Sequence, residues 1–135
     1  MRIPNSFRLF LLCVFAVFMV QSKSLLLSES DDNSHICLYV GDTIKIKLVS
    51  NPTTGYSWAR PELGSQLELV SSQVERPSSD RAGSPGYQVF SFKAREVGDC
   101  TVTLNYLRPF EKNTPPVKVF HVSVRVEARP TKNGE

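Results

Sequence analysis

Apolar and polar residues alternate one by one in short runs along most of this 135-residue chain. Residues 43–49 (T-I-K-I-K-L-V) show the pattern most clearly, with Ile44, Ile46 and Leu48 on one face and two lysines on the other. A period of two is that of a half-buried β-strand, whereas an amphipathic helix repeats every 3.6 residues. No stretch after residue 22 sustains a helical period. The alternation therefore predicts an all-β domain.

Turn-forming residues divide the alternating runs into seven or eight expected strands. Clusters of Gly, Pro, Ser and Asn separate the runs about every ten residues. This number of short strands in roughly 100 residues favours an immunoglobulin-like β-sandwich, in which the core lies between two sheets. The expected strands cover residues 36–40, 43–49, 56–60, 66–75 (one or two strands), 87–94, 100–107 and 117–127.

The first 22 residues have the composition of a cleaved secretory signal peptide. Arg2 and Arg8 make a basic start, and the apolar run at residues 9–20 is too short for a permanent membrane anchor. Cleavage is expected after Ser22 or Ser24, and a short anchor or a buried helix is the alternative. We therefore expect a signal peptide at residues 1–22, a flexible lead at 23–34, one domain at 35–128 and a tail at 129–135.

Removal of the signal peptide changes the net charge. The full chain has 16 Lys and Arg against 13 Asp and Glu. Loss of Arg2, Arg8 and, with the later cleavage, Lys23 leaves 14 or 13 basic residues and a net charge of +1 or zero. The remaining cations are scattered singly, which argues against binding to nucleic acid or to a membrane. We expect a monomer that is secreted or held in endolysosomal-type vesicles.

The chain offers few groups for catalysis. His35 lies near the start of the first expected strand, and His121 falls on the polar face of the last one, beside Ser123 and Arg125. Such a position is typical of a half-exposed strand residue rather than of a catalytic base. No G-x-S-x-G or C-G-S-C-W sequence marks a nucleophile, and no spacing of ligands or glycines suits a metal or a phosphate. We expect neither an enzyme nor a bound metal or cofactor.

Two cysteines, Cys37 and Cys100, remain after signal removal. In an oxidising compartment an even pair can form a disulfide, and their spacing around Trp58 loosely matches the Cys…Trp…Cys pattern of an immunoglobulin domain. That pattern has Tyr two residues before the second Cys, where this chain has Gly98. Cys100 alternates with core residues, whereas Cys37 is out of step with the apolar residues of its strand. We expect two free thiols, with a disulfide as the alternative.

Three proline-containing loops lie between the expected strands: N-P-T-T-G-Y at residues 51–56, G-S-P-G at 83–86 and R-P-F at 108–110. In a sandwich, alternate connections emerge at the same end, so the three can lie together. Each is stiffened by proline and carries few charges. Stiff loops on a rigid scaffold suit a binding module, because little conformational entropy is lost on docking. Ordinary Gly/Pro turns are the alternative interpretation.

Taken together and in this order, the three loop sequences resemble the chagasin family of inhibitors of papain-like cysteine peptidases. The family pattern is N-P-T-T-G-[YF], then G-x-G-G, then R-P-[WF]. Here the first motif is matched in full, the third has Phe110, and the second departs because Pro85 replaces a glycine. The resemblance covers about residues 36–127. It implies a reversible, non-covalent inhibitor whose loops occlude the active-site cleft.

By this resemblance the three loops form a wedge that contacts cathepsin L- or B-type peptidases, with no cofactor and no metal. Thr53 and Thr54 would lie nearest the peptidase Cys–His pair and offer backbone and hydroxyl hydrogen bonds. Phe110 would anchor the wedge on the cleft wall. A secreted immunoglobulin-like adhesion module is the alternative function. The expected contact residues are Asn51, Pro52, Thr53, Thr54, Gly55, Tyr56, Gly83, Ser84, Pro85, Gly86, Arg108, Pro109 and Phe110.

Overall fold

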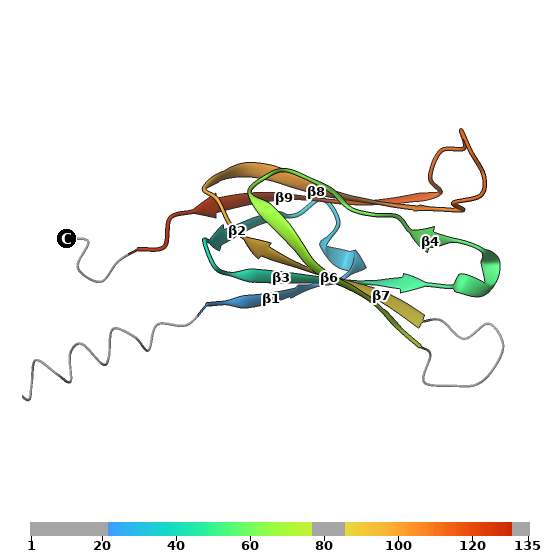
Figure 1. Cartoon of the computed structure of the whole chain (residues 1–135), viewed down its shortest axis with the longest axis horizontal. Helices are drawn as coiled ribbons and strands as arrows, with labels where there is room; N and C mark the ends of the chain where they lie inside the picture. The colour runs from blue at the N-terminus through green and yellow to red at the C-terminus, as the bar shows by residue number, and fades with distance from the viewer. Residues whose placement is uncertain (1–21, 77–85, 131–135) are drawn as a thin grey trace, which may run out of the picture.

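The computed structural model describes residues 22–76 and 86–130, which form nine β-strands in two facing sheets (Figure 1). Two short 3₁₀ turns, η1 (Glu29–Asp31) and η2 (Pro52–Thr54), lie between strands. The first sheet has the order β1-β3-β7-β6, from β1 (Ser24–Leu27), β3 (Thr43–Ser50), β7 (Gly86–Ala94) and β6 (Leu67–Glu75). The second has the order β2-β9-β8-β4, from β2 (His35–Tyr39), β9 (Lys118–Glu127), β8 (Gly98–Leu107) and β4 (Ser57–Trp58), and β5 (Glu62–Leu63) also pairs with β8.

The core lies between the two sheets, as the alternation predicts. Ile44, Ile46 and Leu48 of β3 are 0% exposed, while Lys45 between them is exposed. On the facing sheet, β9 buries its even-numbered residues in the same way, from Phe120 onward. Full burial of one such side chain stabilises the fold by roughly 1.5–3 kcal/mol. The prediction of an all-β sandwich is confirmed.

Two short strands, β1 and β5, raise the strand number above the seven or eight expected. The prediction of a flexible lead is wrong for β1, which pairs in parallel with β3 from Ser24 opposite Thr43 to Leu27 opposite Ile46. Leu27 is 3% exposed and belongs to the core cluster. A four-residue strand is too short to show a clear period, so burial of Leu27 against β3 is what orders it.

The two cysteines lie on either side of β9. Cys37 of β2 pairs with Arg125, and Cys100 of β8 pairs with Val124. Two strand spacings separate them by roughly 10 Å, beyond the Cα separation of about 7 Å that a disulfide allows. Cys37 is exposed and Cys100 is half-buried against the core, and both are free thiols. The expectation of free thiols is confirmed.

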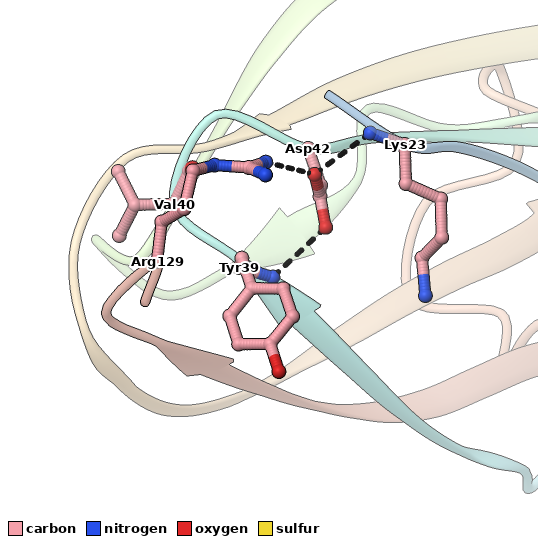
Figure 2. Close-up of polar contacts among 5 residues, drawn as sticks. All are labelled: Lys23, Tyr39, Val40, Asp42 and Arg129. Carbon is pink, nitrogen blue, oxygen red and sulfur yellow. Dashed lines mark hydrogen bonds and ion pairs between the residues drawn. The ribbon is translucent and has the colours of Figure 1, made fainter. Parts of the chain in front are cut away.

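A buried carboxylate ties both ends of the domain to the turn between β2 and β3 (Figure 2). Asp42 is 1% exposed and accepts hydrogen bonds from the backbone N–H of Lys23 and of Tyr39, both at 2.9 Å. The guanidinium of Arg129 donates to the same carboxylate. Residue 129 was expected to begin a frayed tail, and this is wrong for Arg129 because an ion pair with a buried partner holds it.

Burial by itself raises the pKa of the Asp42 carboxyl. The two backbone hydrogen bonds and the Arg129 guanidinium outweigh that effect, because all three favour the ionised form. The pKa of Asp42 is therefore lowered from its ordinary value. The carboxylate stays charged in the folded protein at neutral pH.

Candidate functional site

The strand ends that bound the three predicted loops lie at one end of the sandwich, at the right in Figure 1. Ser50 at the end of β3 pairs with Gly86 at the start of β7, and Glu75 at the end of β6 pairs with Tyr87. In the second sheet, Ser57 pairs with Leu107 at the end of β8. Gly86 is a buried strand residue rather than a loop residue. The expected contact residues Gly83, Ser84 and Pro85 lie outside the described residues.

The first loop is a single turn of 3₁₀ helix that starts at proline and ends at glycine. Pro52 occupies its first position, where a fixed φ and a missing N–H have no cost. Gly55 ends the turn with φ +85°, a left-handed conformation that favours glycine. Thr54 N–H donates to Asn51 O at 3.1 Å, and Gly55 N–H donates to Pro52 O at 3.0 Å. The exposed apex is thus a closed turn.

Both threonine hydroxyls at the apex bond within the loop. Thr53 Oγ1 donates to Asn51 Oδ1 and Thr54 Oγ1 donates to Asn51 O, each at 2.7 Å. Tyr56 N–H in turn donates to Thr54 Oγ1 at 3.3 Å. A hydroxyl has one proton, so in this conformation neither can donate to a partner, although the oxygens can still accept. The two threonines are exposed, and their hydroxyls also stabilise the shape of the loop.

Arg108 of the third loop braces the first loop. Its Nε donates to Thr54 O at 3.2 Å, and its guanidinium carbon lies 4.4 Å from the centroid of the Tyr56 ring. Glu111 holds the far side of the guanidinium through an ion pair of 3.1 Å with Nη1. Arg108 and Tyr56 were both expected as peptidase contacts, and in this structure they contact each other instead. An exposed cation–π contact of this kind contributes about 0.5–1 kcal/mol.

Phe110 is the exposed aromatic residue of the third loop. Its side chain is 70% exposed and lies against Gly55, where a Cβ atom would come within 3.2 Å of Phe110 Cε1. Because residue 55 has no side chain, the Phe110 ring can pack directly against the turn. A large apolar side chain that is both exposed and held in place is typical of an interface anchor.

An aromatic cluster beneath the loops was not predicted from the sequence. Tyr106 stacks on Tyr56 with 5.5 Å between ring centroids and packs against Trp58 in a tilted arrangement with 4.9 Å between centroids. Its hydroxyl accepts a hydrogen bond from Asn51 N–H at 3.1 Å, and Trp58 Nε1 donates to Val49 O at 2.9 Å. One sequence feature could have predicted this cluster: Tyr106 is the last residue of an inward-facing apolar series next to a loop, where its hydroxyl needs a hydrogen-bond partner.

The described residues show no arrangement suited to catalysis or metal binding. His121 is half-buried on the outer face of β9, as expected, and His35 is exposed at the start of β2. A hollow of about 530 Å³ lined by residues of β2, β8 and β9, Cys37 and Arg125 among them, lies away from the loops. Within residues 22–76 and 86–130 no group of three His, Cys, Asp or Glu could hold a metal ion. In that part of the chain no helix is long and apolar enough to cross a membrane.

Comparison with known proteins assigns the family. The sequence profile described as "Chagasin family peptidase inhibitor I42" matches residues 37–124, from β2 to β9. The chain belongs to the chagasin family. The chagasin-family match spans the first and third loops and both sheets. Because the family consists of peptidase inhibitors, which are not enzymes, membership confirms the expectation that this protein is not an enzyme.

Individual chagasin-family relatives agree with this assignment. Amoebiasin-2 of Entamoeba histolytica is 33% identical over 101 residues, which cover 73% of this chain and 82% of the relative. Chagasin of Trypanosoma cruzi is 26% identical over 88 residues, 62% of this chain and 80% of the relative. The crystal structure of the cysteine protease inhibitor EhICP2 from Entamoeba histolytica has a TM-score of 0.72 at 28% identity, covering 80% of this chain and all of that one.

Proposed function

We propose that this protein inhibits papain-like cysteine peptidases by inserting its wedge into the active-site cleft, reversibly and without a covalent bond. The observation that carries the proposal is the exposed, uncharged 3₁₀ apex at residues 52–54, with the 70% exposed Phe110 held beside it. Residues 50–58 contain no charged side chain, so their insertion into a cleft leaves no unpaired charge behind. Family membership and the relatives, cysteine protease inhibitors among them, support the choice of target.

The internal hydrogen bonds of the first loop explain why it would resist cleavage. A peptidase must polarise the scissile carbonyl of an extended substrate in its oxyanion hole. In this loop the carbonyl of Asn51 accepts from Thr54, that of Pro52 accepts from Gly55, and that of Thr54 accepts from Arg108. These three carbonyls are therefore held in a closed 3₁₀ turn, so the loop would occupy the cleft without presenting them in the extended form of a substrate.

The same bonds reduce the entropic cost of binding. Pro52 restricts the backbone before binding, and Arg108 already links the first and third loops in the free protein. A loop that is ordered in advance loses less freedom when it docks, which is the basis of tight binding by preorganised inhibitors.

Titration of the domain against papain, with the Phe110→Ala variant alongside, tests the proposal. We expect stoichiometric, reversible inhibition by the wild type and a Ki that is about 10- to 100-fold higher for Phe110→Ala, because anchor residues contribute about 2 kcal/mol or more. The free energy of unfolding should change by less than about 0.5 kcal/mol, because the ring is exposed.

Val97→Ala is the matched control, since Val97 is 60% exposed in the turn before β8, at the opposite end of the sandwich. Its Ki should equal that of the wild type. Absence of inhibition at a large excess of wild-type domain would contradict the proposed function. Unfolding of Phe110→Ala would show that Phe110 is a core residue instead of an anchor.

We also propose that the chain enters the secretory pathway and is cleaved between Ser22 and Lys23. Lys23 N–H donates to Asp42, and Lys23 O accepts from Thr43 N–H at 2.9 Å, so cleavage after Ser24 would remove both bonds and the first residue of β1. Cleavage before Lys23 would turn the donor into an ammonium group, which makes a stronger hydrogen bond to a carboxylate. These contacts support the earlier of the two sites expected from the sequence.

Intact mass and N-terminal sequencing of protein recovered from the medium of a eukaryotic secretion host would check the cleavage site. We expect a chain that begins at Lys23. A chain that begins at Leu25, or one that keeps residues 1–22, would rule out this processing.

A further inference from the structure

Gln88 is a buried polar residue on the core face of β7. It is 9% exposed, on the same face as Phe90 and Phe92, which are 2% and 0% exposed. Its Oε1 accepts hydrogen bonds from Ser50 Oγ at 2.9 Å and from Trp58 N–H at 2.8 Å, and its Nε2 donates to Trp58 O at 3.2 Å. The side-chain amide thus contacts two residues, and these flank the first loop on either side.

Through these hydrogen bonds the side chain of Gln88 links three strands, β3, β4 and β7, directly below the first loop. Ser50 is the last residue of β3 in one sheet, and Trp58 is the last residue of β4 in the other. Toward Trp58 the amide behaves like a neighbouring strand, because it pairs with both the N–H and the C=O. Gln88 also stands two residues after Gly86, where the second loop motif ends. One side chain therefore joins both ends of the first loop to the strand that follows the second.

We propose that Gln88 is a positioning residue for inhibition: it holds the two ends of the first loop at a set separation and ties them to β7. This inference rests on the proposed function. Gln88 is itself buried and lies below the apex, so it acts through Ser50 and Trp58 and not by touching the peptidase. A loop whose ends can shift would present its apex in several orientations, of which few fit the cleft.

Replacement of Gln88 by methionine isolates this role. Methionine has a similar length and fills the same space, but it cannot donate to Trp58 O, and its thioether is only a weak acceptor in place of the amide oxygen. Ser50 Oγ and the N–H and C=O of Trp58 would lose these partners, so the loop ends would have to move toward other partners or water. The apolar packing around Phe90 and Phe92 would be kept.

Asp42→Asn is a matched control in the turn between β2 and β3, which lies at the other end of the sandwich (Figure 1). Asp42 is also a buried polar residue with several hydrogen bonds, but these go to the chain ends and not to the loops. Both variants should therefore lower stability, while Gln88→Met alone should change the geometry of the wedge.

Inhibition constants against papain, measured where circular dichroism shows all variants folded, test the inference. We expect Gln88→Met to raise Ki at least tenfold and Asp42→Asn to change it less than twofold, although both lower the urea midpoint. A Ki within twofold of the wild type for folded Gln88→Met would overturn the inference. An equal rise in Ki for Asp42→Asn would also overturn it, because general destabilisation would then be the cause.

Hydrogen exchange in the free protein gives a second measurement that does not depend on a peptidase. Gln88→Met should accelerate exchange of the Thr54 and Gly55 amides, which close the 3₁₀ turn, by a larger factor than exchange of the β9 amides, which changes only with the global stability. Unchanged exchange at both loop amides would overturn the inference. If the wild type inhibits no papain-like peptidase, the proposed function fails, and the exchange experiment still decides whether Gln88 orders the loop.

Ser50→Ala provides a smaller change in case Gln88→Met does not fold. It removes one of the three bonds and leaves the pairing of Gln88 with Trp58 intact. We expect a threefold or greater rise in Ki together with faster exchange at Gly55. Wild-type values for both quantities would contradict the positioning role.

Discussion

At the scale of single residues, the shape of the first loop follows from two special positions. Proline at residue 52 and glycine at residue 55 were expected to make a turn, and the structure has a 3₁₀ turn with φ +85° at Gly55. The partners of the threonine hydroxyls were not predictable, because a hydroxyl can rotate toward any nearby acceptor. Local sequence therefore determines that the chain turns here, and folded geometry determines which donors stay free.

Gly55→Ala should weaken inhibition because both the backbone and Phe110 oppose a side chain there. A left-handed conformation costs a non-glycine residue about 1–2 kcal/mol, and the new Cβ would approach Phe110 Cε1 at 3.2 Å. We expect a loss of stability of that size, measured by urea unfolding, together with a clear rise in Ki.

Gly41→Ala is the control for this backbone effect. Gly41 has φ +97° in the turn between β2 and β3, far from the wedge, and its nearest neighbour for a Cβ is Ser22 Oγ at 3.5 Å. Its stability should fall by a similar amount while its Ki stays at the wild-type value. A rise in Ki for Gly41→Ala would mean that inhibition follows stability and not loop shape.

At the scale of secondary structure, alternation was a sufficient guide to the longer strands and missed two of the three short ones, β1 and β5. The expected strands at residues 43–49, 87–94 and 100–107 differ from β3, β7 and β8 by at most two residues at either end. β1 and β5 have four and two residues, so neither is long enough to show a period. Each forms because a neighbouring strand offers backbone groups for pairing: β3 for β1 and β8 for β5.

Leu27→Ala tests whether β1 belongs to the folded domain. Leu27 is 3% exposed in the core, so loss of its side chain should lower the free energy of unfolding by about 2–5 kcal/mol. Leu26→Ala is the adjacent control, because Leu26 is 65% exposed and its loss should cost less than about 0.5 kcal/mol. Urea unfolding checks both, and equal stability of the two variants would show that β1 does not dock.

At the scale of the whole molecule, the two ends of the sandwich have different tasks. One end carries the loops, supported by Gln88 and the aromatic cluster around Tyr106. At the other end Asp42 joins the β2–β3 turn to Lys23 and Arg129, which precede β1 and follow β9. This separation means that stability and inhibition can be changed by different substitutions.

Asp42 should make the stability of the protein depend on pH in the acid range. Its pKa is lowered in the folded state, so its stabilising contribution is complete above the ordinary value of about 3.9 and is lost as the pH falls through the lowered pKa. Asp42→Asn lacks this titration. Urea unfolding at pH 7, 5 and 3 should show a stability difference between wild type and variant that shrinks toward pH 3. A difference that stays constant with pH would contradict this role.

The identity of the strands, the inward faces of the long ones and the three loop motifs could be read from local patterns, because each depends on neighbours within a few residues. The order of the strands could not, since it depends on which hydrogen-bonding edges meet. The roles of Tyr106, Gln88 and Arg108 could not be predicted either. Their hydrogen-bond partners in and beside the first loop lie 30 to 55 positions away along the chain. Contacts between distant residues are set when both sheets pack on one core, and those contacts brace the proline–glycine turn of the first loop.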